Sequence, residues 1–119
     1  MIKIQNSKPY KLEERTYLFA RECRNFVKLL PKCTANFEYG KQLIRSSGSV
    51  AANYIEANEA LSKKSFRYRI NICRKEAKES RLWLKLSEVR ADKEEDKNQL
   101  VNEAYELTKI FASIVEKSR

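Results

Sequence analysis

Apolar residues recur at intervals of three and four along four segments of the chain, which is the spacing of one face of an α-helix. The spacing predicts helices over about 11–30, 38–58, 63–90 and 97–117. With two Gly and two Pro among 119 residues, the chain lacks the turn formers that a β-sandwich or barrel needs. We therefore expect one all-α domain over residues 1–119, folded as an antiparallel up-and-down four-helix bundle.

Local signals mark the ends of these helices. Pro31 cannot donate the next backbone hydrogen bond and ends the first helix, and 32–37 is interpreted as a connector. Ser62 is a suitable N-cap for the third helix. Gly48 falls inside the second helix, where it costs stability, and this predicts a close backbone approach at that point.

The apolar faces predict both a core and a contact with another subunit. On the second helix the residues expected to face inward are Leu43, Ile44, Val50, Ala51, Tyr54 and Ile55. The third and fourth helices carry a second apolar line beside the first, typical of a helix that also meets another subunit. We expect a homo-oligomer; the alternative is a monomer with a wide core.

The positive charge is concentrated in two parts of the chain. Of the net charge of +9, residues 1–37 carry eight basic and three acidic groups, and residues 62–90 carry ten and three. The basic side chains at helical spacing are Arg21, Arg24 and Lys28 on the first helix, and Arg67, Arg74, Lys78, Arg81 and Lys85 on the third. Such a surface favours nucleic-acid phosphates, with an anionic membrane surface second; the alternative is an ordinary solvated face.

The absence of histidine excludes most catalytic and metal chemistry. It removes the commonest metal ligand and the commonest general base, including the Glu-x-x-His pairs of di-iron bundles. The sequence also has no glycine-rich phosphate loop and no nucleophile elbow. We expect no enzyme, no cofactor and no metal. A residual enzymatic interpretation would need a deep pocket lined by Arg45, Asn53, Glu56 and Glu79.

The compartment follows from the cysteines and from hydropathy. Cys23, Cys33 and Cys73 are odd in number and form no Cys-x-x-Cys pair, and Cys23 and Cys73 fall on apolar stripes. No apolar run has the length of a signal peptide or of a membrane span. We expect a cytoplasmic protein with no membrane partner.

A polar stripe follows one side of the second helix. Its members are Gln42, Arg45, Ser46, Ser49, Asn53 and Glu56. We interpret it as a structural network in which Arg45 and Asn53 reach Glu76 or Glu79 on the third helix, since buried polar groups must satisfy one another. The alternative is a ligand site inside the bundle.

Segment 42–57 resembles the signature of the four-helix-bundle proteins encoded by bacterial 23S rRNA intervening sequences, often labelled S23 ribosomal protein. That pattern runs Gln-Leu-x-Arg-Ala-x-x-Ser-Ile-x-x-Asn-Ile-x-Glu-Gly, and it is matched here at Gln42, Leu43, Arg45, Ser49, Asn53 and Glu56. Ser46, Tyr54 and Ala57 depart from it. The run from Cys73 to Ser80, followed by Trp83-Leu84, resembles one branch of the family.

The resemblance covers about residues 15–117 and carries its own implications. It implies a four-helix bundle, a ring-shaped homopentamer, and kinship with the basic pentameric accessory proteins of diversity-generating retroelements, which are proposed to bind nucleic acid. It brings no known catalytic activity with it.

Two functions follow as hypotheses. The first is a non-enzymatic, oligomeric protein that contacts phosphates, of RNA more than of DNA, without reading sequence. The alternative is a protein–protein interaction scaffold whose charge serves solubility.

Overall fold

The computed structural model describes residues 11–119 as an all-α chain without a β-strand in that range. The four α-helices are α1 (Leu12–Lys28), α2 (Thr34–Asn58), α3 (Lys63–Leu86) and α4 (Glu94–Lys117). A short 3-10 turn, η1 (Ala91–Lys93), precedes α4. The first ten residues of the expected domain lie outside the described residues.

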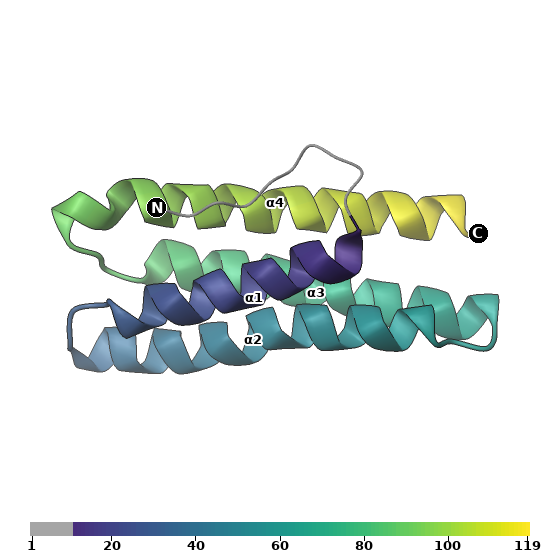
Figure 1. The fold of residues 1–119 in the computed structure, drawn as a ribbon, viewed down its shortest axis with the longest axis horizontal. Helices are drawn as coiled ribbons and strands as arrows, with labels where there is room; N and C mark the ends of the chain where they lie inside the picture. The colour runs from purple at the N-terminus through teal and green to yellow at the C-terminus, as the bar shows by residue number, and fades with distance from the viewer. Residues whose placement is uncertain (1–10) are drawn as a thin grey trace.

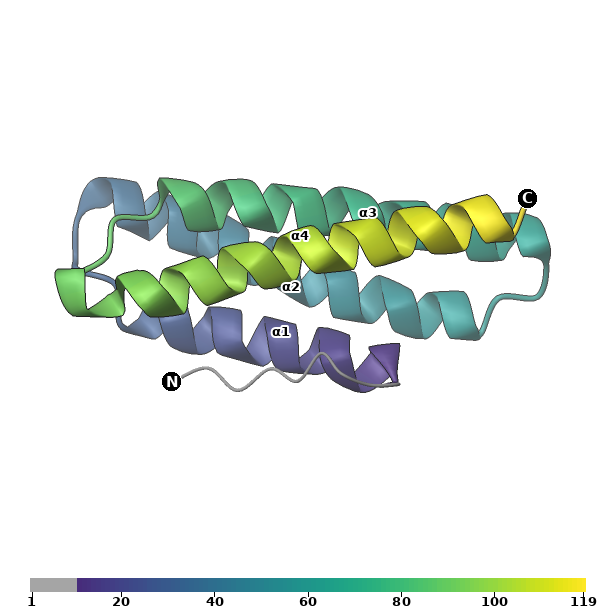
Figure 2. The same ribbon diagram turned by 90° about the horizontal axis from the view of Figure 1, so that it is seen from above.

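The four helices lie side by side in a molecule of 45 × 29 × 19 Å, with connections that alternate between its two ends (Figure 1). Each helix contacts the next one along the chain, and α1 also meets α4. The two views together place α1 and α3 on opposite sides, with α2 and α4 between them (Figure 2). Over residues 11–119, no Cα atom of α1 lies within 8 Å of a Cα atom of α3.

The interior is filled by the apolar line of each helix. Fully buried apolar side chains are Phe19, Cys23, Leu43, Val50, Ile70, Cys73, Ala77, Leu84, Leu100, Ala104, Leu107 and Phe111. Burial of each large side chain contributes about 1.5–3 kcal/mol, so this cluster is the main source of stability. The three-and-four spacing is confirmed most clearly on α4, where it identifies four of these residues.

Three helix ends differ by three residues or more from the predicted ones. Helix α3 ends at Leu86 rather than near Arg90, because the backbone is extended at Ser87. Helix α2 begins at Thr34 rather than near Glu38, because the Sγ of Cys33 accepts a hydrogen bond from the Asn36 N–H and caps the helix. Helix α4 begins at Glu94 rather than near Lys97, since its acidic first turn lies at the positive end of the helix dipole. The predicted N-cap at Ser62 is confirmed; its hydroxyl accepts from the Ser65 N–H.

The inward face of α2 was only partly predicted. Leu43 and Val50 are buried, but Ile44 and Ile55 are 47% and 46% exposed. The positions beside Leu43 and Val50 that enter the core are small, among them Ser46. Its hydroxyl is satisfied inside the bundle, so this polar residue can face the core while larger apolar ones face outward.

The glycine that meets a close neighbour is Gly40, not Gly48. A Cβ added at Gly40 would lie 3.0 Å from Cγ1 of Val27 on α1, whereas one added at Gly48 would meet nothing within 4 Å. Gly48 therefore costs helix stability without a packing reason, and the close approach expected there is wrong.

Replacing Gly48 by alanine is expected to raise the free energy of unfolding by about 0.5–1 kcal/mol, because alanine fits the helix and loses less chain entropy on folding. Urea denaturation measures the change. Gly40→Ala is the matched control: Val27 must move there, so the gain is expected to be smaller or absent. A Gly48→Ala protein less stable than wild type would contradict this packing.

The three free cysteines are expected to react very differently with a thiol reagent. Burial raises the pKa of Cys73 to about 12 and also raises the pKa of Cys23, while Cys33 is exposed. Ellman's reagent should therefore modify only Cys33 in the folded protein at neutral pH, and all three in denaturant. Unfolding lets both buried thiols ionise near their ordinary pKa of 9.0, so their contribution to stability is full below that pH and is lost progressively as the pH rises from there through the raised pKa of the folded state. Rapid labelling of more than one thiol in the native state would contradict this.

Candidate nucleic-acid interface and the polar network beside it

Three of the five predicted cations on α3 form an open basic surface. Arg74, Lys78 and Lys85 are exposed and have no ion-pair or hydrogen-bond partner among residues 11–119. The other two are engaged on the side that meets α4. Arg67 donates from Nη1 to the Ser118 carbonyl at 2.9 Å, and Arg81 is half-buried against an aromatic ring. The open surface is therefore smaller than the sequence suggests.

The aromatic ring belongs to Tyr105 of α4, a residue that the sequence did not connect with the basic surface. The guanidinium carbon of Arg81 lies 5.0 Å from the ring centroid, and Nζ of Lys109 lies 4.7 Å from it. Tyr68, the aromatic residue nearest to these cations in the sequence, contacts Arg69 instead. The sequence places Tyr105 on the fourth helix but does not show which residues surround it. Only the packing of α3 against α4 brings its ring next to Arg81.

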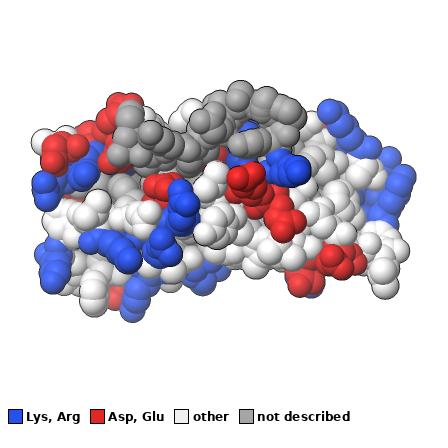
Figure 3. Space-filling model, viewed as in Figure 1, with Lys and Arg blue, Asp and Glu red and all other residues white. Residues whose placement is uncertain are grey.

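The cations predicted on α1 form a separate surface. Arg21 pairs with Glu22 at 3.0 Å, Arg24 donates to Oδ1 of Asn25, and Lys28 is exposed at the end of the helix. Because α1 lies opposite α3, these side chains do not extend the α3 surface. Figure 3 views the side that carries α1 and shows basic and acidic side chains interspersed.

The polar stripe of α2 connects α2 to α3 through Arg45. Its guanidinium contacts Glu76 at 3.2 Å and Glu79 at 3.1 Å, and its Nε also donates to Oε1 of Gln42 at 3.4 Å. The hydrogen bond to Glu76 is the main cause that raises the pKa of Arg45. This geometry fixes the two helices in register and leaves no open cationic site at Arg45.

The rest of the stripe does not reach the α3 carboxylates. Asn53 donates to Ser49 at 3.0 Å and accepts from Nη1 of Arg69 at 2.9 Å, so the expected contact of Asn53 with Glu76 or Glu79 is wrong. Glu56 is exposed. The four residues of the residual enzymatic interpretation are thus paired with neighbours or face solvent, and they do not converge on a pocket.

Two buried polar contacts were missed from the sequence. Nε and Nη2 of Arg15 donate to the two carboxylate oxygens of Glu103 at 2.7 and 2.9 Å, joining α1 to α4 in the interior. The hydroxyls of Ser46 and Ser80 lie 2.7 Å apart between α2 and α3. The sequence offers one hint of burial, because each charged residue of the pair stands next to a buried residue of its helix. Arg15 precedes Thr16 on α1, and Glu103 precedes Ala104 on α4.

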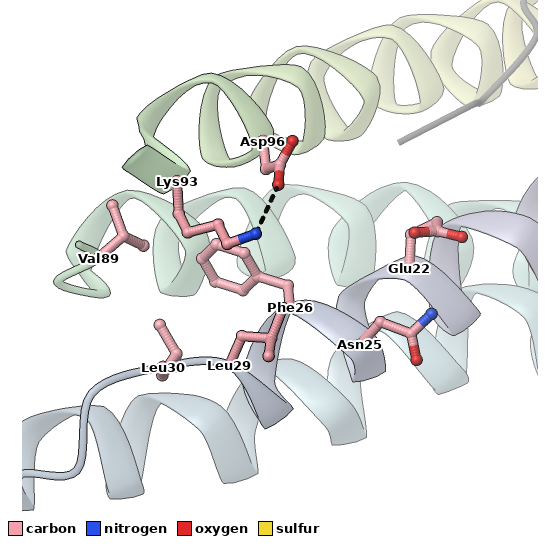
Figure 4. Close-up of a pocket in the computed structure, with 8 residues that line it drawn as sticks. All are labelled: Glu22, Asn25, Phe26, Leu29, Leu30, Val89, Lys93 and Asp96. Carbon is pink, nitrogen blue, oxygen red and sulfur yellow. Dashed lines mark ion pairs between the residues drawn. The ribbon is translucent and has the colours of Figure 1, made fainter. Parts of the chain in front are cut away.

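A small cavity lies where the end of α1 meets the start of α4 (Figure 4). Phe26, Leu29, Leu30 and Val89 supply its apolar wall, and Lys93 points toward Asp96, with which it pairs at 3.9 Å. Its volume of about 120 Å³ is well below the roughly 300 Å³ at which ligand pockets begin. Within residues 11–119 no group of three or more His, Cys, Asp or Glu residues could hold a metal ion. None of the described helices has the length and hydropathy to span a membrane.

Comparisons with known proteins point to one family. The profile of the family described as 23S rRNA-intervening sequence protein matches residues 9–113. A similar crystal structure is that of a protein of unknown function from the S23 ribosomal protein family of Bacteroides thetaiotaomicron VPI-5482. It is 29% identical, with a TM-score of 0.76, and the match covers 88% of this chain and 98% of that one. No curated protein matches the sequence. Neither description names an enzyme.

Proposed function

This chain belongs to the 23S rRNA-intervening sequence protein family, and on that premise we propose that it is a non-enzymatic protein that binds nucleic acid, RNA in preference to DNA. The observation that carries the proposal is the row of Arg74, Lys78 and Lys85 along α3, exposed and without acidic partners among the described residues. The family description supplies the reason to test RNA first.

The geometry of this row suits a phosphate backbone. At a rise of about 1.5 Å per residue, Arg74 and Lys85 lie about 16 Å apart along the helix, which spans several phosphates of a strand. Unpaired cations gain most from phosphates, since binding releases condensed counterions and breaks no ion pair in the protein. Such contacts position a nucleic acid without reading its sequence.

Filter binding of a structured RNA at two salt concentrations tests the proposal. Three phosphate contacts predict that affinity falls about 20- to 40-fold between roughly 50 and 200 mM salt. A structured DNA of matched length is the comparison for the RNA preference. Absence of binding at low salt, or binding that does not change with salt, would overturn the proposal.

We also propose that the helices form an antiparallel up-and-down bundle that assembles into a homopentameric ring. The alternating connections support the first part. The exposed apolar side chains of α2, Phe37, Ile44 and Ile55, support a contact between subunits. Light scattering after size exclusion should give about 70 kDa from five chains of 14.0 kDa; a monomeric mass would contradict the ring.

The same apolar side chains favour the second candidate, a scaffold that binds another protein. Phe37 and Ile44 lie in a groove between α1 and α2 that also contains Lys28, Lys32 and Lys41. Substitution of Phe37 by serine separates the two functions: it should abolish a protein contact there and leave RNA binding through α3 unchanged.

We place the protein in the cytoplasm. Its three cysteines are free, as a reducing compartment keeps them, and RNA is available there. Fractionation of cells that produce a tagged protein tests this location.

A further inference from the structure

We propose that the groove between α3 and α4 holds an unpaired base of a single-stranded nucleic acid against Tyr105, while neighbouring cations hold its phosphates. The inference rests on the proposed function and specifies which form of nucleic acid the protein binds. The groove has a volume of about 300 Å³, and its lining residues are Lys78, Arg81, Leu82, Lys85, Tyr105 and Thr108. No acidic residue is among them.

Apolar surface is exposed in the middle of this basic cluster. Tyr105 is 43% exposed and Leu82 is 48% exposed, and both line the groove. Arg81 and Lys109 lie against the ring of Tyr105, which restrains its position. These cations cover part of the ring, and a base packs on the part that is left exposed, where a restrained ring loses little conformational freedom.

Arg81 has an unsatisfied hydrogen-bonding capacity. It makes no ion pair or hydrogen bond with residues 11–119, and its Nε is buried without a partner. A buried N–H donor without an acceptor is unfavourable. Lys78 and Lys85, one turn to either side, are equally unpaired. A phosphate in the groove would be attracted by all three unpaired charges, which favour it over a neutral ligand.

The apolar residues decide between a single strand and a duplex. A duplex presents phosphates to a protein surface and keeps the faces of its bases stacked inside, so Tyr105 and Leu82 would contribute little to its binding. A single strand offers base faces together with phosphates, and stacking on an aromatic ring does not depend on the base sequence. The combination of unpaired cations with an exposed ring and an aliphatic side chain therefore favours the single strand.

The test compares Tyr105→Leu with Tyr68→Leu, using a short RNA single strand and an RNA duplex of equal length as probes. Tyr68 is the matched control, because it is an exposed tyrosine beside an arginine on α3 and does not line the groove. Tyr105→Leu should weaken single-strand binding at least about fivefold and leave duplex binding within about twofold. Tyr68→Leu should change neither, and Tyr105→Phe, which keeps the ring, should bind as wild type.

The salt dependence supplies a second readout. Tyr105 contacts no phosphate in this account, so Tyr105→Leu should lower single-strand affinity while the slope of log affinity against log salt stays that of wild type. Circular dichroism checks that each variant keeps its helix content.

Two outcomes would overturn the inference: equal effects of Tyr105→Leu and Tyr68→Leu, or equal losses for single strand and duplex. In either case salt-dependent binding by the wild-type protein would leave the proposed function standing. If the wild-type protein binds neither probe at low salt, the proposed function fails and the inference fails with it.

Discussion

Replacing Arg15 by methionine is expected to lower the free energy of unfolding by about 3–5 kcal/mol. Arg15 is 8% exposed and Glu103 is 5% exposed, and the two form a pair of hydrogen bonds between α1 and α4. Methionine removes the guanidinium and leaves the Glu103 carboxylate inside the bundle without its ion-pair partner. An uncompensated buried charge costs more than the pair contributes, so the effect should be large for one substitution.

Two control variants test whether the loss of stability comes from the unpaired buried carboxylate. In the double variant Arg15→Met with Glu103→Leu the buried charge is gone, and much of the lost stability should return. Arg90→Met removes the pair of Arg90 with Asp92, in which both side chains are exposed, and should change stability by less than about 1 kcal/mol. Urea denaturation measures all three. A loss for Arg15→Met as small as that for Arg90→Met would contradict the buried pair.

Reversing Arg74, Lys78 and Lys85 together to glutamate is expected to weaken RNA binding about 100-fold or more at low salt, with no loss of fold. Each unpaired cation that leaves a phosphate costs about 1 kcal/mol, and each new carboxylate adds repulsion. Arg81 is left unchanged, since it is half-buried against Tyr105 and a glutamate there would disturb the packing of α3 on α4.

Reversal of Arg21, Arg24 and Lys28 on α1 is the matched control, because it changes the net charge by the same amount on the opposite side of the bundle. We expect a clearly smaller loss of affinity, measured by the same titration. Equal losses for the two variants would mean that the total charge binds RNA and that the α3 surface has no special part.

The core could be predicted from the sequence wherever one apolar line dominates a helix. On α4 the line that contains Leu107 and Phe111 has larger apolar side chains than the second line beside it, and both residues are fully buried. On α2 two lines compete, and the chain buries small side chains such as Ser46 while Ile44 and Ile55 remain exposed. The spacing of apolar residues does not show which of two such lines is buried. That depends on how closely α3 approaches α2 and on the hydrogen bond between the hydroxyls of Ser46 and Ser80.

The sequence predicted on which helix face the candidate interface lies, but not which of its cations remain unpaired. Helical spacing places Arg74, Lys78 and Lys85 on one side of α3, and this needs no tertiary information. Contacts between helices decide the rest. The capture of Arg67 by the Ser118 carbonyl and the packing of Arg81 on Tyr105 join residues far apart in the chain, as does the pair of Arg15 with Glu103. A single sequence contains no signal that relates such residues.

The central claim is that the open cations of α3 hold phosphates, and the salt dependence of RNA binding tests it most directly. The slope of log affinity against log salt should be about −2 to −3 for the wild-type protein, and it should become much shallower for the triple reversal of Arg74, Lys78 and Lys85. The same slope in both proteins would contradict the claim.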